Sequence, residues 1–222
     1  MKRIYKHLSN VNFQVNNILE IYSKASPDEL LSGKAWYRQA NGIASAMAVK
    51  YGLNLHQCAG IIASLSPATN WNQNIVDANH LCAYLKAGKN IHSITVTTYG
   101  KNKEKAYYIY RHPELSEKEI YKIILGASKH VNKTSSFYLN ILHPDNDSNV
   151  TIDRHSFRIN LGITELTTIA LTEKRYKLMS NAYKQASEQL EYNAIELQAI
   201  TWLIFRRLYI QTREANFEVA PF

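Results

Sequence analysis

The sequence predicts an all-α protein. Apolar residues recur at helical spacing through most of the chain, for example in residues 12–24 and 194–211. Ser-x-x-Glu capping boxes, which open helices, begin at Ser26 and Ser116, and the first is followed by a proline at the first helical position. The one β-rich stretch, residues 89–100, has no partner strand, so we expect a loop there. Together these signals predict roughly nine or ten helices.

Helix boundaries follow from capping residues, glycine and proline. The helix opened by Ser26 is expected to break near Ser32-Gly33, before a longer helix that ends at Gly52. Asn54 can cap a helix that is apolar on nearly every side and is therefore expected at the centre of a core. That helix stops at Ser66-Pro67, because proline disfavours helical geometry in the residue before it. Later helices are expected at residues 71–88 and 101–111, from Ser116 to Gly126, around Lys133, from Asp153 to Gly162, and at residues 172–192 and 194–211.

Composition limits the class of protein. The 222 residues carry 26 basic and 18 acidic side chains, a formal charge of +8, which favours a polyanionic partner but leaves the absence of one equally open. Cys58 and Cys82 form no CxxC motif, which excludes a structural zinc or an iron–sulfur cluster held by four cysteines. No signal core and no run of membrane-spanning length is present, so we expect a cytoplasmic protein.

Two charged residues at predicted helix starts are the main candidates for chemistry. The turn Leu125–His130 resembles a phosphate seat, with a glycine, free backbone N–H groups and basic neighbours, although an ordinary corner between two helices has the same form. Lys133 starts the helix after this turn, and Asp153 starts the next one after a polar loop. Asp153 could simply cap its helix. We expect the amine and the carboxylate to face each other across a cleft that receives one nucleotide.

The segments around these two residues resemble the helix-hairpin-helix–GPD superfamily of DNA glycosylases. Lys133-Thr134 matches the end of the family's LPGVGxKT hairpin, and VTIDRHSFRI from Val150 to Ile159 matches its VDTHVxRV segment. Upstream, IIASLSPATNWNQNIVDA resembles an early helix, turn and helix of the family, with Ala68 in place of a glutamine that many members push into the DNA stack. Downstream, ELQAITWLIFR resembles the closing helix of a phage-associated branch that processes hypermodified bases. The hairpin has one glycine instead of two, and the absent cysteine cluster indicates a branch without the iron–sulfur cluster.

The resemblance implies a single two-lobed helical unit over residues 1–222. One lobe would span about residues 30–145, with the hairpin near 116–143, and the other would combine residues 1–29 with 146–222. The partner would be double-stranded DNA that contains a modified base, bound by a monomeric, nucleoid-associated protein. No cofactor or metal is implied, apart from a monovalent or divalent cation that could occupy the hairpin.

The resemblance also assigns residues to roles. Asp153 falls on the catalytic aspartate and Lys133 on the lysine that bifunctional members use as nucleophile. The DNA-binding candidates are Gly126, Ser128, Lys129, His130, Asn132, Thr134, Arg154 and His155. The candidates for the base pocket or for stacking on the base are Ser66, Ala68, Asn70, Trp71, Asn74, Phe137 and Trp202, although aromatic residues at helical spacing belong more often to a core.

The implied function is a DNA glycosylase, a hydrolase of base excision repair, that flips a modified or damaged base out of the duplex and removes it. Asp153 would stabilise positive charge on the sugar, and neutral Lys133 would attack C1′ for Schiff-base AP lyase chemistry. Lys133 could instead contact a phosphate. Two alternatives remain open: a phage-type enzyme that processes hypermodified bases, either pyrophosphorylase-like or a defence glycosylase, and a non-catalytic helical DNA-binding module.

Overall fold

A computed structural model describes residues 7–128, 130–165 and 169–211, and every regular element within these ranges is a helix. The predicted all-α class is therefore confirmed, and in residues 89–100 only the short 3-10 turn η1 and the first residue of α6 are helical, with no strand. The helices are α2 (Val11–Tyr22), α3 (Pro27–Tyr51), α4 (Leu55–Leu65), α5 (Trp71–Lys86), η1 (Ile91–Ser93), α6 (Gly100–Arg111), α7 (Glu117–Leu125), α8 (Lys133–Leu142), α9 (Arg154–Leu161), α10 (Glu173–Glu188), α11 (Ala194–Arg206) and the π-helical η2 (Arg207–Gln211). Within the described ranges, none of them is both long and apolar enough to cross a membrane.

The chain divides into two compact units. Unit 1 comprises Met1–Tyr37 and Asp145–Phe222, and unit 2 comprises Arg38–Pro144. The sequence-based boundary near residue 145 lies beside the second division, whereas the first division falls between Tyr37 and Arg38, further along α3 than the boundary expected near residue 30.

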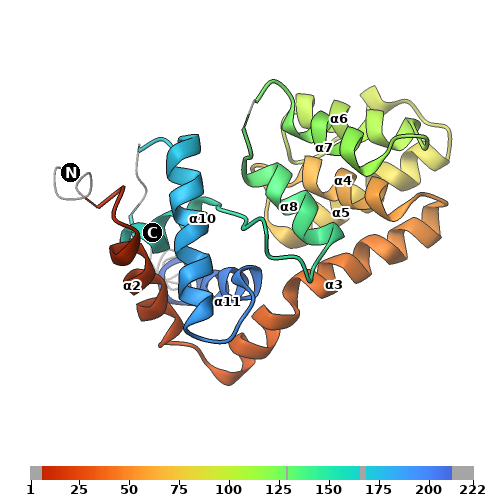
Figure 1. The fold of residues 1–222 in the computed structure, drawn as a ribbon. Helices are drawn as coiled ribbons and strands as arrows, with labels where there is room; N and C mark the ends of the chain where they lie inside the picture. Colours follow the sequence, from red (N-terminus) through yellow and green to blue (C-terminus); the bar gives the residue numbers. More distant parts are fainter. Residues whose placement is uncertain (1–6, 129, 166–168, 212–222) are drawn as a thin grey trace, which may run out of the picture. The chain divides into compact units, whose positions relative to one another are not determined.

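Unit 2 is built around α4. Every residue from Gln57 to Leu65 is buried, as expected for a helix that is apolar on nearly every side. Helices α5, α6, α7 and α8 all pack against it (Figure 1). Gly60 permits the close approach of α7, because a Cβ at this position would lie 2.7 Å from Cγ2 of Ile120. The core of unit 2 is thus a buried helix surrounded by its neighbours in the sequence.

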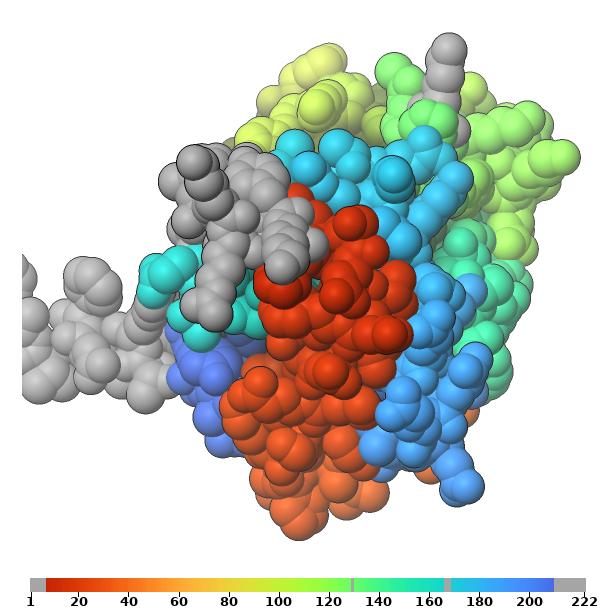
Figure 2. All heavy atoms as spheres, turned by 60° about the vertical axis from the view of Figure 1, so that its left-hand side comes forward, coloured from red at the N-terminus to blue at the C-terminus, as the bar shows by residue number. Residues whose placement is uncertain are grey.

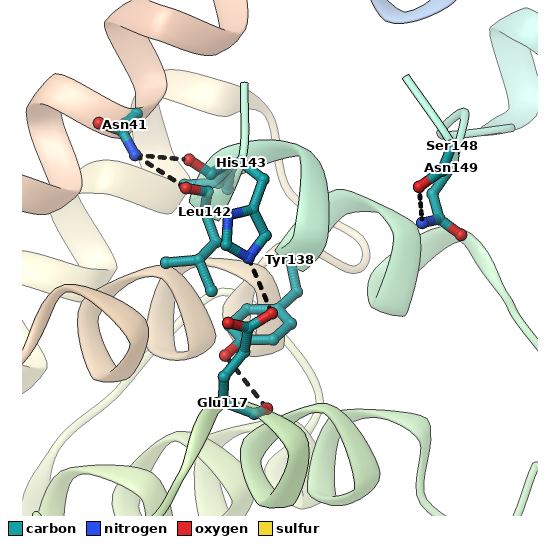
Figure 3. Close-up of polar contacts among 8 residues, drawn as sticks. Asn41, Glu117, Tyr138, Leu142, His143, Ser148 and Asn149 are labelled. Carbon is teal, nitrogen blue, oxygen red and sulfur yellow. Dashed lines mark hydrogen bonds and ion pairs between the residues drawn. The ribbon is translucent and has the colours of Figure 1, made fainter. Parts of the chain in front are cut away.

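Polar contacts fasten the α7–α8 hairpin within unit 2. Figure 3 shows His143, at the end of α8, beside Glu117, the first residue of α7, with 2.8 Å between Nε2 and Oε1. The hydroxyl of Tyr138 donates to the carbonyl oxygen of Glu117 at 3.4 Å. Asn41 of α3 donates from its amide to the carbonyl oxygens of Ile141 and Leu142, at 2.9 and 3.3 Å. The last turn of α8, which leaves carbonyls without helical partners, is satisfied in this way.

Unit 1 is a second helical cluster. Helix α2 packs against α9, α10 and α11, and both Figure 1 and Figure 2 show α2 (red) beside α10 (cyan to blue). Helix α11 is buried from Ala194 to Thr201, which explains why its sequence is so strongly apolar. The polar loop before α9 is attached to α10 by Lys184, whose Nζ donates to the carbonyl oxygen of Ser148 at 2.8 Å.

The predicted break near Ser32-Gly33 is wrong, because α3 is one continuous helix from Pro27 to Tyr51. The predicted Ser26 capping box is present: Ser26 N–H donates to Glu29 at 2.9 Å, and Glu29 N–H donates to Ser26 Oγ at 3.3 Å. Gly33 serves close packing instead of a break. A Cβ there would lie 2.5–2.7 Å from atoms of Ile200, backbone N and Cα included, so the glycine lets α3 and α11 meet.

Replacement of Gly33 by alanine is therefore expected to destabilise the protein by about 2–3 kcal/mol, because backbone atoms of α11 would have to move. The matched control lies in the same helix: a Cβ at Gly42 would have no heavy atom within 4 Å. Gly42→Ala should stabilise the protein by about 0.5–1 kcal/mol through helix propensity alone. Denaturant unfolding of both variants measures the difference, and equal effects would contradict the close contact between α3 and α11.

Candidate functional site

Asp153 lies at the start of α9 in unit 1, where its carboxylate is held by two donors. Oδ1 accepts from the backbone N–H of Ser156 at 2.8 Å, the capping bond of the helix. Oδ2 accepts from the indole N–H of Trp202 at 2.9 Å. The side chain is half-buried, and each carboxylate oxygen keeps further acceptor capacity beyond these bonds. Asp153 is thus a helix cap, as the simpler reading expected, but one whose second oxygen is oriented from another helix.

The backbone before Asp153 is fixed by a buried tyrosine. The hydroxyl of Tyr176 accepts from the N–H of Ile152 at 3.1 Å and donates to the carbonyl oxygen of Val150 at 2.9 Å. Val150 and Ile152 are fully buried, so the apolar positions of this segment anchor it in the core of unit 1. The extended stretch that leads to Asp153 is therefore fixed by hydrogen bonds to its backbone and by burial of its apolar side chains.

A buried polar network lies beneath the cap. Gln198 donates from Nε2 to Ser156 Oγ at 3.1 Å, and its Oε1 accepts from the hydroxyl of Tyr37 at 2.9 Å. The hydroxyl of Tyr183 lies 3.2 Å from Thr201 Oγ1, and burial raises the pKa of this phenol well above its usual value. All of these side chains are buried. A satisfied network of this kind holds the first turn of α9 in one conformation.

Trp202, predicted to stack on a base, donates its indole N–H to Asp153 within unit 1. Its ring is flanked by the guanidinium of Arg206, 4.8 Å from the ring centroid, and by the ring of His155 at 6.1 Å. The ring of His155 also lies 5.8 Å from that of Phe205, so this predicted DNA contact packs among aromatic side chains. Arg154 is exposed on the first turn of α9.

Lys133 is the first residue of α8 in unit 2. Its Nζ lies 5.9 Å from the ring centroid of Phe137, and that ring meets Trp71 edge-on at 6.2 Å. Lys133, Phe137 and Trp71, each predicted as a site residue, thus lie close together. Phe137 is only 7% exposed, so most of its ring is covered by the surrounding residues. Asn132 caps α8, with Oδ1 accepting from the N–H groups of Thr134 and Ser135 at 3.0 and 3.1 Å.

The turn between α7 and α8 uses most of its own hydrogen-bond donors. Gly126 N–H donates to Lys122 O at 2.9 Å, Ser128 N–H to Leu125 O at 3.3 Å, and His130 N–H to Ser128 Oγ at 3.3 Å. The predicted phosphate seat at Gly126, Ser128 and His130 is therefore not a set of free amides. Lys129, also predicted to bind DNA, lies outside the described residues.

The corner between α4 and α5 holds the remaining predicted base contacts. Asn70 caps α5, because its Oδ1 accepts from Gln73 N–H at 3.0 Å. Asn74 and Ser66 are buried, and their polar side-chain atoms have no hydrogen-bond partner among the described residues. Ala68 is exposed and has φ 63°, the left-handed region that alanine rarely adopts. Backbone strain of this kind is often found at functional sites.

Unit 2 contains a pocket of roughly 310 Å³ next to these residues. Its walls come from the end of α4, the start of α6, the end of α7 and the start of α8. The lining residues are Ser64, Pro67, Tyr99, Lys101, Asn102, Lys105, Ile124, Leu125, Asn132, Lys133 and Thr134. The sequence gives no sign of Ser64 or Asn102, because a serine inside an apolar helix and an asparagine inside a basic helix look ordinary.

Lysines of α6 are partly engaged by the fold itself. Lys103 Nζ donates to the carbonyl oxygens of Ile91 and Ile94 at 3.3 and 3.1 Å. Lys105 Nζ donates to Ile124 O at 2.8 Å and so caps the end of α7. Burial, and next the charge of Lys101, lower the pKa of Lys105. The basic face of α6 is thus not simply a solvated surface.

Charge is divided unequally between the units. The sequence of unit 2 has 12 basic and 5 acidic residues, a formal charge of +7, whereas unit 1 has 14 and 13, a charge of +1. Almost all of the positive excess that suggested a polyanionic partner therefore belongs to the unit that contains Lys133 and the pocket. In the described part of the chain, no group of three or more His, Cys, Asp or Glu residues could hold a metal ion.

The chain is an all-helical protein that belongs to a family of unknown function (DUF7178), whose model matches residues 2–209. Searches of curated proteins and of solved structures gave no significant match.

Ala68→Gly is expected to stabilise the protein by about 1 kcal/mol, because glycine adopts the observed φ of 63° without strain. Ala127→Gly, in another exposed turn but without positive φ, is the control and should destabilise by about 0.4–1 kcal/mol. Thermal or urea unfolding compares the two variants. A loss of stability in both would show that the α4–α5 turn is not strained at this residue.

Proposed function

We propose that this protein is a DNA glycosylase that excises a modified base, with Lys133 adding Schiff-base AP lyase chemistry. The proposal rests on the resemblance of Lys133-Thr134 and of residues 150–159 to the helix-hairpin-helix–GPD superfamily. In this proposal α7 and α8 form the family's hairpin, and the helical fold is of the two-lobed type of that family.

The observation that carries the proposal is the anchoring of Asp153. Loss of a base from deoxyribose develops positive charge on the sugar, and a fixed carboxylate lowers the energy of that transition state. The bonds from Ser156 N–H and Trp202 Nε1 hold both oxygens in place without neutralising the charge. A cap needs only the first of these bonds, so the second favours a role in chemistry.

The surroundings of Lys133 support its role as nucleophile. It lines a pocket that also contains Lys101 and Lys105, and its amine, in the neutral form, is the group that would attack a carbon atom. Nζ would form a bond to C1′ while the base leaves with the electron pair of the glycosidic bond. The imine that follows after ring opening permits strand cleavage. A duplex that presents a flipped nucleotide is attracted by the +7 charge of unit 2.

Asp153→Asn is expected to lower the rate of base release about 100-fold or more, because the negative charge is lost. Asparagine is also a good helix cap, so α9 should stay intact, as a melting curve would show. Trp202→Phe removes only the donor to Oδ2 and should lower kcat about 10-fold with little change in KM. Duplexes that each carry one modified base serve as substrates, and abasic sites are the readout.

Full base release by Asp153→Asn on a duplex that the wild type processes would sink the glycosylase assignment. A non-catalytic DNA-binding module would instead show no abasic sites with any duplex, together with salt-sensitive binding that Asp153→Asn does not weaken.

Lys133→Ala is expected to abolish the borohydride-trapped complex with DNA, because no amine remains to form the imine. Lys122→Ala is the control, since Lys122 is an exposed lysine of α7 outside the pocket and its loss should leave trapping unchanged. Gel shift after reduction gives the yield of covalent complex. Equal yields from Lys133→Ala and the wild type would show that another amine is the nucleophile.

A further inference from the structure

The pocket of unit 2 combines three ammonium groups with no carboxylate. Lys101, Lys105 and Lys133 line it, and none of the other lining residues is acidic. Its volume of about 310 Å³ is near the lower end of the range of about 300–1,000 Å³ for small-molecule sites. A small anionic group fits both its charge and its size.

Helix α6 begins at this pocket. Its cap residue, Tyr99, makes no side-chain capping bond, and Tyr99, Lys101 and Asn102 all line the cavity. An uncapped helix start carries partial positive charge and attracts anions. The start of α8 also borders the pocket, but there Asn132 already accepts from two backbone N–H groups.

Ser64 is an independent sign of a ligand. Ser64 lines the pocket and is only 1% exposed, and its Oγ has no hydrogen-bond partner among the described residues. Buried hydroxyl groups nearly always have a partner, since an unmade hydrogen bond is unfavourable. An anionic oxygen in the pocket would supply the acceptor that Ser64 lacks.

We propose that this pocket binds a phosphate group, with Lys101 and Lys105 as counter-charges and Ser64 Oγ as a hydrogen-bond donor. Lys105 Nζ uses one of its three donors on Ile124 O, so two remain for the ligand. The phosphate belongs either to the DNA backbone or to a free phosphate ion, because both present the same oxygens. The proposal does not rest on glycosylase activity, since it requires binding and no bond cleavage.

The electrostatics of Lys105 support this geometry. Burial, followed by the charge of Lys101, lowers the pKa of its ammonium, which means that this charge is partly removed from water and is repelled by a second positive charge nearby. A bound phosphate would relieve that repulsion and stabilise unit 2.

The test is a titration of the full-length protein with inorganic phosphate at constant ionic strength, followed by calorimetry and by the rise in Tm. Lys101→Gln is expected to weaken phosphate binding about 10-fold, and Ser64→Ala several-fold. Because Ser64 Oγ has no partner within the fold, Ser64→Ala should not lower Tm in the absence of phosphate.

Lys122→Gln is the matched control, because it removes the same charge from an exposed residue of unit 2 that does not line the pocket. Phosphate affinity should be unchanged in this variant. Equal weakening by Lys101→Gln and Lys122→Gln would overturn the proposal in favour of diffuse attraction to a basic surface. Absence of binding by the wild type, with phosphate and with oligonucleotide alike, would overturn it as well.

A short single-stranded oligonucleotide distinguishes the two sources of phosphate. Binding that depends on Lys101 and Ser64 and that competes with inorganic phosphate would identify a phosphate of the DNA backbone. Binding of inorganic phosphate without competition by the oligonucleotide would identify a free ion. Base release is measured separately, so the phosphate site and the glycosylase activity can each fail alone.

Discussion

The complete burial of α4 is the constraint on which unit 2 depends. The residues of α4 from Gln57 to Leu65 are all buried and none of them is charged, so the charged side chains of unit 2 lie on its other elements. Both polar atoms of the buried Gln57 side chain have hydrogen-bond partners. Its Nε2 donates to Ile109 O of α6 at 2.9 Å, and its Oε1 accepts from Asn54 N–H at 3.0 Å. Ser64, near the other end of α4, lacks such a partner. The side chain of Gln57 is therefore satisfied within the fold, whereas the hydroxyl of Ser64 is the group that the proposed phosphate would satisfy.

Unit 1 uses buried polarity differently. Its core contains a connected set of hydrogen bonds from Tyr37 through Gln198 to Ser156, and the last of these residues donates its N–H to Asp153. Such a network costs stability unless every member is satisfied, and it fixes geometry when they are. The carboxylate at its end is consequently held more firmly than helix capping requires. The two candidate residues thus differ in character: Asp153 is fixed by hydrogen bonds, whereas Lys133 extends from a helix start beside a pocket.

Local signals in the sequence predicted the helices well and the sites only in part. The capping boxes at Ser26 and Ser116, the cap at Asp153 and the buried character of α4 all depend on residues close together in the chain, and the structure confirms them. The helix break predicted at Gly33 is wrong because the glycine is needed for close packing against Ile200, which lies far along the chain. The bond from Trp202 to Asp153 and the pocket around Ser64 escaped prediction for the same cause, since each joins segments whose register no local pattern reveals.

The lysines of the pocket take part in both proposed properties of unit 2, phosphate binding and lyase chemistry. A bound phosphate affects the second of these through the charge that it adds to the pocket. Burial, and next the charge of Lys101, lower the pKa of Lys105. A phosphate bound beside Lys105 would oppose that shift, because a nearby anion favours the protonated amine. A phosphate ion that stays in the pocket would therefore oppose attack by Lys133, whereas a phosphate that belongs to the substrate would hold DNA beside the amine. The source of the phosphate thus decides whether the pocket assists the lyase step or inhibits it.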